Sequence, residues 1–455
     1  MAVLTAAQVA CGNEPTPPTI EPPPLSAEAE ALIRIVRPQG VSRIPPLVPP
    51  PSVRPELVLL GRMLAFDRLL SGTRTISCMT CHHPVFATSD GRSLPVGQAG
   101  SGLGPNRTPT VMHERAFIPR NSPPLFNLSG QRSFFHDGRV EQTFTFSPGG
   151  GAQNGFRTPA GPQLTANMIR VLEFGAASAV GLFPVTDRDE MRGASDNELA
   201  RLADNDFTGI WSALMRRLGD IPEYRTLFEA AYPGTPFGQM SFAHASNAIA
   251  GFLIAEFSFR RSPWDNFLAG DDRAVSTAQL RGARTFLSQT CSFCHGGPTF
   301  TNFAFFNTGL VQVGPGKGNG PGGRDDFGRQ NVTGIPFDLY RFRTPTLRNV
   351  ELTAPYGHAG QIVSLREFIK HYDDPATALA TYDIKQLEPA LQGMRVANDA
   401  QLLTGLDGTV RVITLSDRDV DDVTEFMKAL TDPAARNLSS RVPLRVPSGL
   451  PVDRP

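Results

Sequence analysis

Two short segments, Cys78–His82 and Cys291–His295, hold the residues in this chain that are best suited to chemistry. Both have the pattern Cys-x-x-Cys-His. Two thiols three positions apart can form thioether bonds to the vinyl groups of one haem, and the adjacent histidine then lies beneath the iron. The sequence therefore predicts two covalently bound haems c. The predicted attachment residues are Cys78, Cys81, Cys291 and Cys294, and the predicted iron ligands are His82 and His295.

Two other interpretations of these cysteines remain open: a pair of redox disulfides, or one shared zinc site. A zinc site would combine both Cys-x-x-Cys units and would give no reason for a histidine directly after each of them. Four of the five cysteines in the chain fall in these two segments. The repeated pattern therefore favours the haems.

Composition bounds the possible partners. The 455 residues leave room for two or three domains, each with its own core. Lys and Arg together number 43, as do Asp and Glu, so no net charge attracts nucleic acid or a membrane surface. The chain has no apolar stretch of about 20 residues, the length needed to span a bilayer. We therefore expect no nucleic-acid partner and no membrane-spanning segment.

The first residues bear on localisation. Haem c is attached outside the bacterial cytoplasm, so we expect export to the periplasm. Residues 1–10 are apolar, but they are too short for a secretory signal and lack its basic start. Cys11 follows them and precedes a proline-rich stretch. This arrangement suggests a lipid anchor at Cys11 on a membrane; the alternative is an unpaired cysteine on a disordered leader.

Helical spacing of apolar residues predicts a mostly α protein with long loops. One predicted helix carries Leu57, Leu60 and Leu64, and another carries Leu280, Ala283 and Leu287. Two more helices are expected, one running from Ile249 to a close at 261–263 and one capped by Ser416. The predicted divisions are a proline-rich leader or tether (1–52), an N-terminal haem c domain (53–240), a C-terminal haem c domain (241–435) and a C-terminal tail (436–455).

A weak internal repeat relates the two haem domains. Ser122–Asn127 resembles Thr344–Asn349, and at the same offset Phe134–Gly138 matches Tyr356–Gly360. Both copies follow a haem segment in the same order. We therefore expect a duplicated haem domain, with a pseudo-two-fold axis that places the haems on either side of an interface.

From about Leu57 to Leu430 the sequence resembles the bacterial di-haem cytochrome c peroxidase and MauG family. The resemblance implies two cytochrome c-like α domains, with peroxide reacting at the N-terminal haem and the C-terminal haem receiving and storing electrons. Its landmarks, besides the two haem segments, are Leu60–Asp67, Pro119–Asn121, His136–Arg139, Ser262–Asp265 and Thr353–Tyr356.

The resemblance implies roles for residues near the first haem. Glu190 matches the glutamate that moves a proton during peroxide cleavage, although it could instead be a solvated carboxylate beside Arg188 and Arg192. His113 matches the histidine that closes the resting haem, or is a surface-loop histidine. The distal glutamine of the family has no counterpart, because this segment reads Ala-Ala-Ser-Ala at 176–179.

Two further histidines have no settled role. The tryptophan that the family places between the haems falls on His136, which could instead make a structural hydrogen bond that it shares with its repeat partner His358. His83, directly after an iron ligand, is expected to face a haem propionate or solvent.

The resemblance also implies ligands at the second haem and between the haems. Peroxidases of the family place a methionine on the far side of the second iron and MauG places a tyrosine; the corresponding position here is Tyr372. The alternative ligands are Met394 and His371. The family holds a calcium ion between the haems, and Asn121, Thr353 and Pro355 occupy its ligand positions, the last two through carbonyl oxygens.

Three functions are compatible with these residues. The leading one is a di-haem oxidoreductase that consumes hydrogen peroxide, supplied with electrons by a small cytochrome c or cupredoxin. The alternative is a MauG-like enzyme that oxidises Trp or Tyr residues of a partner protein through a bis-Fe(IV) state. A plain di-haem electron carrier would need strong ligands on both faces of each iron, and no second methionine–histidine set is evident. The family includes both monomers and homodimers.

Overall fold

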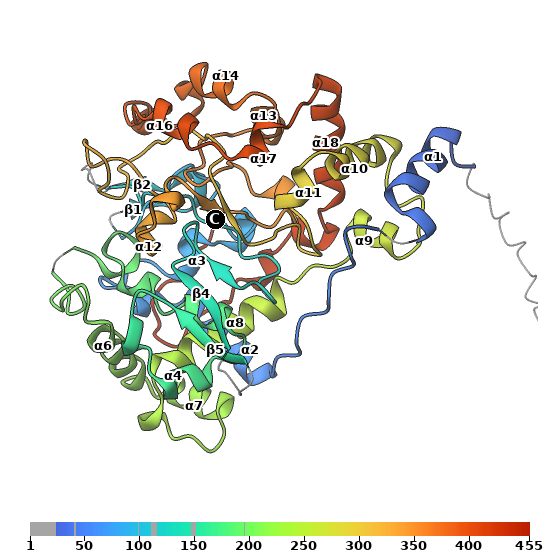
Figure 1. The fold of residues 1–455 in the computed structure, drawn as a ribbon. Helices are drawn as coiled ribbons and strands as arrows, with labels where there is room; N and C mark the ends of the chain where they lie inside the picture. The colour runs from blue at the N-terminus through green and yellow to red at the C-terminus, as the bar shows by residue number, and fades with distance from the viewer. Residues whose placement is uncertain (1–23, 41, 99, 111–115, 147–151, 195) are drawn as a thin grey trace, which may run out of the picture.

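The computed structural model describes residues 24–40, 42–98, 100–110, 116–146, 152–194 and 196–455. Helices predominate, and Figure 1 shows one group of them in the lower part of the view and another in the upper part. The mostly α class expected from the sequence is confirmed. Within the described ranges, no helix combines the length and the apolar character that crossing a membrane requires.

Helices α2 (Pro55–Phe66) and α8 (Phe242–Glu256) form the centre of the first group. Leu57, Leu60 and Leu64 lie at helical spacing on α2 and are fully buried, as predicted. Almost all of α8 is buried, which agrees with its apolar residues on every side. The helices that pack around this pair are α4 (Ala166–Val171), α5 (Ala176–Val180), α6 (Phe207–Gly219) and α7 (Pro222–Ala231).

Helices α10 (Thr277–Ser288) and α18 (Asp417–Ala429) form the centre of the second group. The predicted cap of α18 is confirmed, because the Ser416 hydroxyl accepts a hydrogen bond from the Asp419 amide at 3.2 Å. The helices beside this pair are α1 (Ala27–Val36), α9 (Pro263–Leu268) and α13 (Leu365–His371).

Each central helix pair meets at a glycine. A Cβ atom on Gly61 would lie 1.9 Å from the carbonyl oxygen of Ala248, and one on Gly282 would lie 1.9 Å from the carbonyl oxygen of Asp422. No side chain fits at either position. The two backbones therefore touch directly, and this contact sets the distance between the helices.

Replacing Gly282 with alanine should lower the free energy of unfolding of the haem-loaded protein by about 1–3 kcal/mol or more, because the added methyl group must push α10 and α18 apart. Denaturant unfolding measures this change. Gly393→Ala is the matched control: its φ is −83° and an added Cβ meets no atom within 4 Å, so a change of about 0.5 kcal/mol or less is expected. Equal effects of the two substitutions would contradict the close helix contact.

A short helix carries each thiol pair: α3 (Cys78–Cys81) follows α2, and α11 (Cys291–Cys294) follows α10. A three-stranded antiparallel sheet of β3 (Ser133–Phe134), β4 (Val140–Phe146) and β5 (Ala152–Arg157) pairs Phe134 with Val140. The turn between β3 and β4 holds residues 135–139. The remaining short elements are α12 (Gln330–Thr333), α14 (Pro375–Ala380), α15 (Pro389–Gln392), α16 (Asp399–Thr404), α17 (Gly408–Arg411), and the two-stranded pairs β1 (Gly100–Ser101) with β2 (Thr108–Pro109) and β6 (Phe305–Phe306) with β7 (Phe342–Arg343).

Two expected features differ from the structure. The helix expected to close at 261–263 ends at Glu256, and Ser262 instead caps α9, where Pro263 is tolerated in the first turn. The expected tether contains helix α1, whose Ala29, Leu32 and Val36 are buried. These residues join the apolar cluster of the second helix group. The residues before 24 lie outside the described part of the chain.

Candidate functional site

The first thiol pair lies on α3. Its first turn is fixed by the Thr80 hydroxyl, which accepts a hydrogen bond from the Ser77 amide at 2.9 Å. His82 follows, and its Nδ1–H donates to the carbonyl oxygen of Thr88 at 3.2 Å, since a carbonyl can only accept. Burial lowers the pKa of His82 to about 4. The ring is therefore neutral, and Nε2 keeps the electron pair that a metal requires.

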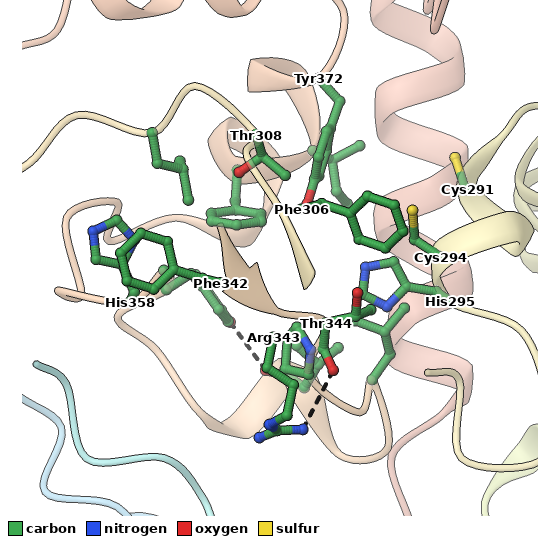
Figure 2. Close-up of a pocket in the computed structure, with 18 of the residues that line it drawn as sticks. Cys291, Cys294, His295, Phe306, Thr308, Phe342, Arg343, Thr344, His358 and Tyr372 are labelled. Atoms are coloured by element: carbon green, nitrogen blue, oxygen red, sulfur yellow. Dashed lines mark hydrogen bonds between the residues drawn. The ribbon is translucent and has the colours of Figure 1, made fainter. Parts of the chain in front are cut away.

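The second thiol pair repeats this arrangement on α11. The Nδ1–H of His295 donates to the carbonyl oxygen of Phe300 at 3.0 Å, and burial lowers the pKa of His295 to about 4. Figure 2 shows Cys291, Cys294 and His295 on the same side of a pocket. The empty volume of this pocket is about 1860 Å³, including the part open to solvent. Its apolar lining includes Phe286, Leu347, Ile369, Val423 and Met427.

Tyr372 lines the same pocket from the C-terminal end of α13. Figure 2 shows its hydroxyl directed into the pocket. Burial and the neighbouring thiols raise the pKa of Tyr372 above its ordinary value. The two alternative ligands lie elsewhere: His371 donates through Nε2 to the carbonyl oxygen of Thr308 at 2.7 Å, and Met394 packs against a separate apolar cluster.

Both thiol segments have the features needed to hold a haem c. In each, two thiols on one helical turn precede a neutral, backbone-anchored imidazole, and at the second site an apolar pocket opens beside them. Cys78 packs against the core of the first helix group and Cys291 against that of the second, so the two pairs do not converge as a shared zinc site requires. The four described cysteines are free thiols.

Glu190 lies in a turn that Asp187 begins by accepting hydrogen bonds from two backbone amides. Its Oε1 accepts a hydrogen bond from Nη2 of Arg139 at 2.9 Å. Burial and the Asp187 carboxylate together raise the pKa of Glu190 to about 7, although Arg139 opposes the shift. The carboxylate also lies within electrostatic reach of the first thiol pair, because its charge raises the pKa of Cys78.

The alternative reading of Glu190, a solvated carboxylate beside Arg188 and Arg192, is wrong. Both arginines pair with Asp204 instead, at 2.6 and 2.9 Å. The Glu190 side chain is only 20% exposed. A carboxyl group whose pKa lies near neutrality can accept and return a proton at physiological pH.

A chain of ion pairs leads from Glu190 toward the second half of the molecule. The Arg139 guanidinium stacks on the Phe135 ring at 3.7 Å and lies 3.6 Å from Asp137. Asp137 pairs with Arg120 at 2.5 Å, and Arg120 pairs with Asp326 at 2.6 Å. Asp137, Arg120 and Asp326 are buried. They therefore form a buried chain of charges that water screens little, and it ends at the loop that carries Asp326.

His136 lies in the turn between β3 and β4. Its Nε2–H donates to the carbonyl oxygen of Asn121 at 3.0 Å, and burial lowers its pKa to about 4. His358, its partner in the sequence repeat, instead stacks on Phe342 with the ring centres 3.8 Å apart. Nδ1 of His358 accepts from the Gln361 side-chain amide at 3.5 Å, whereas His136 donates to a backbone carbonyl, so the two histidines do not share one kind of hydrogen bond.

The residues expected to bind calcium, Asn121, Thr353 and Pro355, all line the pocket of the second site. The Asn121 side-chain amide donates to the carbonyl oxygens of Arg92 at 2.6 Å and Ser93 at 3.2 Å. This anchoring orients the amide and leaves its oxygen as the group that can serve a cation.

Two predicted residues, His113 and Cys11, lie outside the described residues. His83 was expected to face either a haem propionate or solvent. It does not face solvent, because it is buried, and its Nε2–H donates to the Asp453 carbonyl oxygen at 3.3 Å. The cause is the segment 448–454, which covers it.

Sequence reasoning missed two residues at the sites. Arg139 is the last residue of the His136–Arg139 segment that the family resemblance identified. Its positive charge could have indicated a partner for a carboxylate. Met427 lines the second pocket from α18 and follows that helix's apolar spacing, so it resembled an ordinary core residue.

Comparisons with known proteins agree with this geometry. The family model described as di-haem cytochrome c peroxidase matches residues 55–273. Cytochrome c551 peroxidase of Pseudomonas aeruginosa is 30% identical over 312 residues, which are 68% of this chain and 69% of that protein. Methylamine utilization protein MauG of Methylorubrum extorquens is 29% identical over 335 residues, 72% of this chain and 73% of that protein.

Solved structures show the same fold. A MauG-like protein associated with microbial copper homeostasis superposes with a TM-score of 0.57 at 24% identity, covering 87% of this chain and 96% of that chain. The diheme peroxidase BthA of Burkholderia thailandensis gives a TM-score of 0.57 at 20% identity, covering 89% and 91%. Taken with the sequence relatives and the two Cys-x-x-Cys-His sites, these matches show that the chain is an enzyme of the di-haem cytochrome c peroxidase family, to which MauG is also related.

Proposed function

We propose that hydrogen peroxide reacts at the first haem site and that the second site stores or relays the electrons. The observation that carries this assignment is Glu190, a largely buried carboxyl group with a pKa near 7 that Arg139 holds within electrostatic reach of the first thiol pair. No equivalent carboxylate lines the described pocket of the second site. When bound, the first haem supplies the iron that peroxide must reach before its O–O bond breaks.

The residues at the first site have different roles in this reaction. Cys78, Cys81 and His82 would hold the first haem covalently and from one side, leaving the other side for peroxide. Glu190 accepts the proton from the inner peroxide oxygen and returns it to the outer one, so that water can leave. Arg139 holds the carboxylate in place through its hydrogen bond at 2.9 Å.

At the second site, Cys291 and Cys294 would hold the haem covalently, and His295 and Tyr372 would supply ligands for its iron. Support comes from the position of Tyr372 in the same pocket, with its hydroxyl directed inward (Figure 2). An anionic oxygen ligand stabilises oxidised iron. This observation favours the second candidate function, a MauG-like oxidation of Trp or Tyr residues in a partner protein, over rapid turnover with a high-potential donor.

We further infer that the two haem domains arose by duplication. Three contacts that recur in both domains support this inference. The first is the close helix contact at Gly61 in one domain and at Gly282 in the other. The backbone amide of Asn127 donates to the carbonyl oxygen of Phe257 just after α8, and the backbone amide of Asn349 donates to that of Leu430 just after α18. The His82 and His295 rings are each anchored to a carbonyl five or six residues later. The residue boundaries 53–240 and 241–435 stay a prediction.

Between the sites, we propose a calcium ion held by the Asn121 side chain and the carbonyl oxygens of Thr353 and Pro355. A hard cation takes oxygen ligands on irregular loops, and these three residues line one pocket. His136 donates to the Asn121 carbonyl oxygen and lines the same pocket with a neutral ring.

The expected setting follows from the haem chemistry. Covalent haem c implies the periplasm, and the relatives named as cytochrome c peroxidases support a small cytochrome c or cupredoxin as donor. The lipid anchor at Cys11 and the choice between monomer and homodimer stay predictions.

The test is to mix the haem-loaded, fully oxidised protein with hydrogen peroxide and follow peroxide consumption, with and without a reduced c-type cytochrome or cupredoxin. Sustained consumption with the donor supports the peroxidase function. A stoichiometric reaction that the donor barely accelerates supports the protein-modifying function. No reaction with peroxide under either condition would refute both.

A further inference from the structure

The segment that follows α18 returns to the first haem site. Figure 1 marks the end of the chain close to α3. The Thr80 hydroxyl donates to Oδ2 of Asp453 at 2.5 Å, although the two residues are 373 positions apart. Arg68 pairs with the other Asp453 oxygen at 2.5 Å. Thr80 is fully buried and Asp453 is 7% exposed, so water competes little for this contact.

The donor and acceptor roles in this contact are unambiguous. A carboxylate and a carbonyl can only accept, so the Thr80 hydroxyl and the His83 Nε2–H both donate to Asp453. The other side of each group is also occupied. Thr80 accepts from the Ser77 amide at 2.9 Å, and His83 accepts through Nδ1 from the Val85 amide at 3.3 Å. Asp453 thus bonds the residues on both sides of Cys81 and His82.

The segment is held firmly by contacts elsewhere. The Ser448 hydroxyl donates to Oδ1 of Asp67 at 2.7 Å, just after α2. Arg62 on α2 donates to the carbonyl oxygen of Arg441 at 3.0 Å. Val446 is 1% exposed and belongs to the core of the first helix group. Asp453 is therefore presented to α3 by a docked segment.

In the described part of the chain, the second thiol turn has no such carboxylate contact; the Thr290 hydroxyl just before it donates instead to the carbonyl oxygen of Thr409 at 2.7 Å. Phe293 stands between Cys291 and Cys294 at the position that Thr80 has between Cys78 and Cys81, and it is 60% exposed. The two turns share the same pattern but differ in what lies against them. In experiments on Asp453, the second site can therefore serve as an internal control.

We propose that Asp453 is a positioning residue for the first haem site, acting through Thr80 and His83 to fix the turn that carries His82. Its carboxylate also places a negative charge within electrostatic reach of Cys81. This inference rests on the proposed haem at Cys78 and Cys81.

The experiment compares Asp453→Ala, Thr80→Val and the double variant with the parent protein, all in the haem-loaded form. The readouts are haem content, the electron paramagnetic resonance signals of the two ferric haems, and a redox titration. The expected result is a shifted or broadened signal for the first haem only. Asp453→Ala and the double variant, which lose the carboxylate charge, should also raise the reduction potential of that haem. The two single variants should change its signal alike, and the double variant should add little. Thr80→Ser, which keeps the hydroxyl, should restore the parent spectrum.

Val446→Ala is the matched control, because it loosens the same segment without touching the turn. It should lower the unfolding temperature and leave the first-haem signal in place. Equal shifts at both haems, unchanged signals in both single variants, or a Val446→Ala spectrum like that of Asp453→Ala would each overturn the proposal. A parent protein that carries no first haem or ignores peroxide would instead refute the proposed function.

Discussion

Replacing Glu190 with glutamine should slow peroxide cleavage at the first site by roughly 10²–10⁴-fold, the usual value of a positioned acid–base group. Glutamine keeps the size of the side chain and can still accept a hydrogen bond from Arg139, so haem content should not change. It cannot take up the proton that the inner peroxide oxygen must lose. Stopped-flow mixing of the oxidised, haem-loaded protein with peroxide measures the rate.

The same substitution should remove a pH dependence. Because burial raises the pKa of Glu190 to about 7, the carboxyl group is largely protonated below that pH and cannot accept a proton. The parent rate should therefore rise as the pH increases through about 7, whereas the Glu190→Gln rate should stay flat. Glu28→Gln is the control: this carboxylate lies on α1, in the other helix group, and is 55% exposed, so the parent rate and profile should persist. A Glu190→Gln rate like that of the parent would remove the assignment.

Replacing Tyr372 with phenylalanine should abolish the low-spin signal of the second ferric haem and raise the reduction potential of that haem. The hydroxyl is the group directed into the pocket, and an anionic oxygen ligand favours ferric over ferrous iron. Electron paramagnetic resonance and a redox titration measure the two changes. The first haem should keep its own signal.

Tyr382→Phe provides the matched control for this substitution. The Tyr382 hydroxyl donates to the carbonyl oxygen of Gln361 at 2.6 Å, outside the second pocket. Its loss should cost about 0.5–1.5 kcal/mol of stability and leave both haem signals unchanged. If the second-haem signal survives in Tyr372→Phe, the far-side ligand is another group, with Met427 the next candidate in the pocket, and the ordinary peroxidase function gains support.

Much of the local structure was predictable because its causes are local. The two thiols and the histidine of each haem segment fall within five consecutive residues, so their spacing alone indicates the chemistry. Apolar residues at helical spacing predicted α2, α10 and α18 correctly, since one face of each helix must be buried. The end of α8 was less predictable, because Ser262 and Pro263 can close one helix or begin the next, and here they begin α9.

The tertiary structure decided which residues act together. Glu190 could not be distinguished from a solvated carboxylate by sequence, because its raised pKa depends on burial and on Asp187 and Arg139 around it. His371 and Tyr372 are neighbours in sequence, and only the packing of α13 turns the tyrosine into the pocket. The bond between Thr80 and Asp453 joins residues 373 positions apart, and no periodicity in the sequence indicates it. Short-range patterns thus determined the haem-binding motifs and their helices, whereas contacts between distant segments set the environment in which those motifs work.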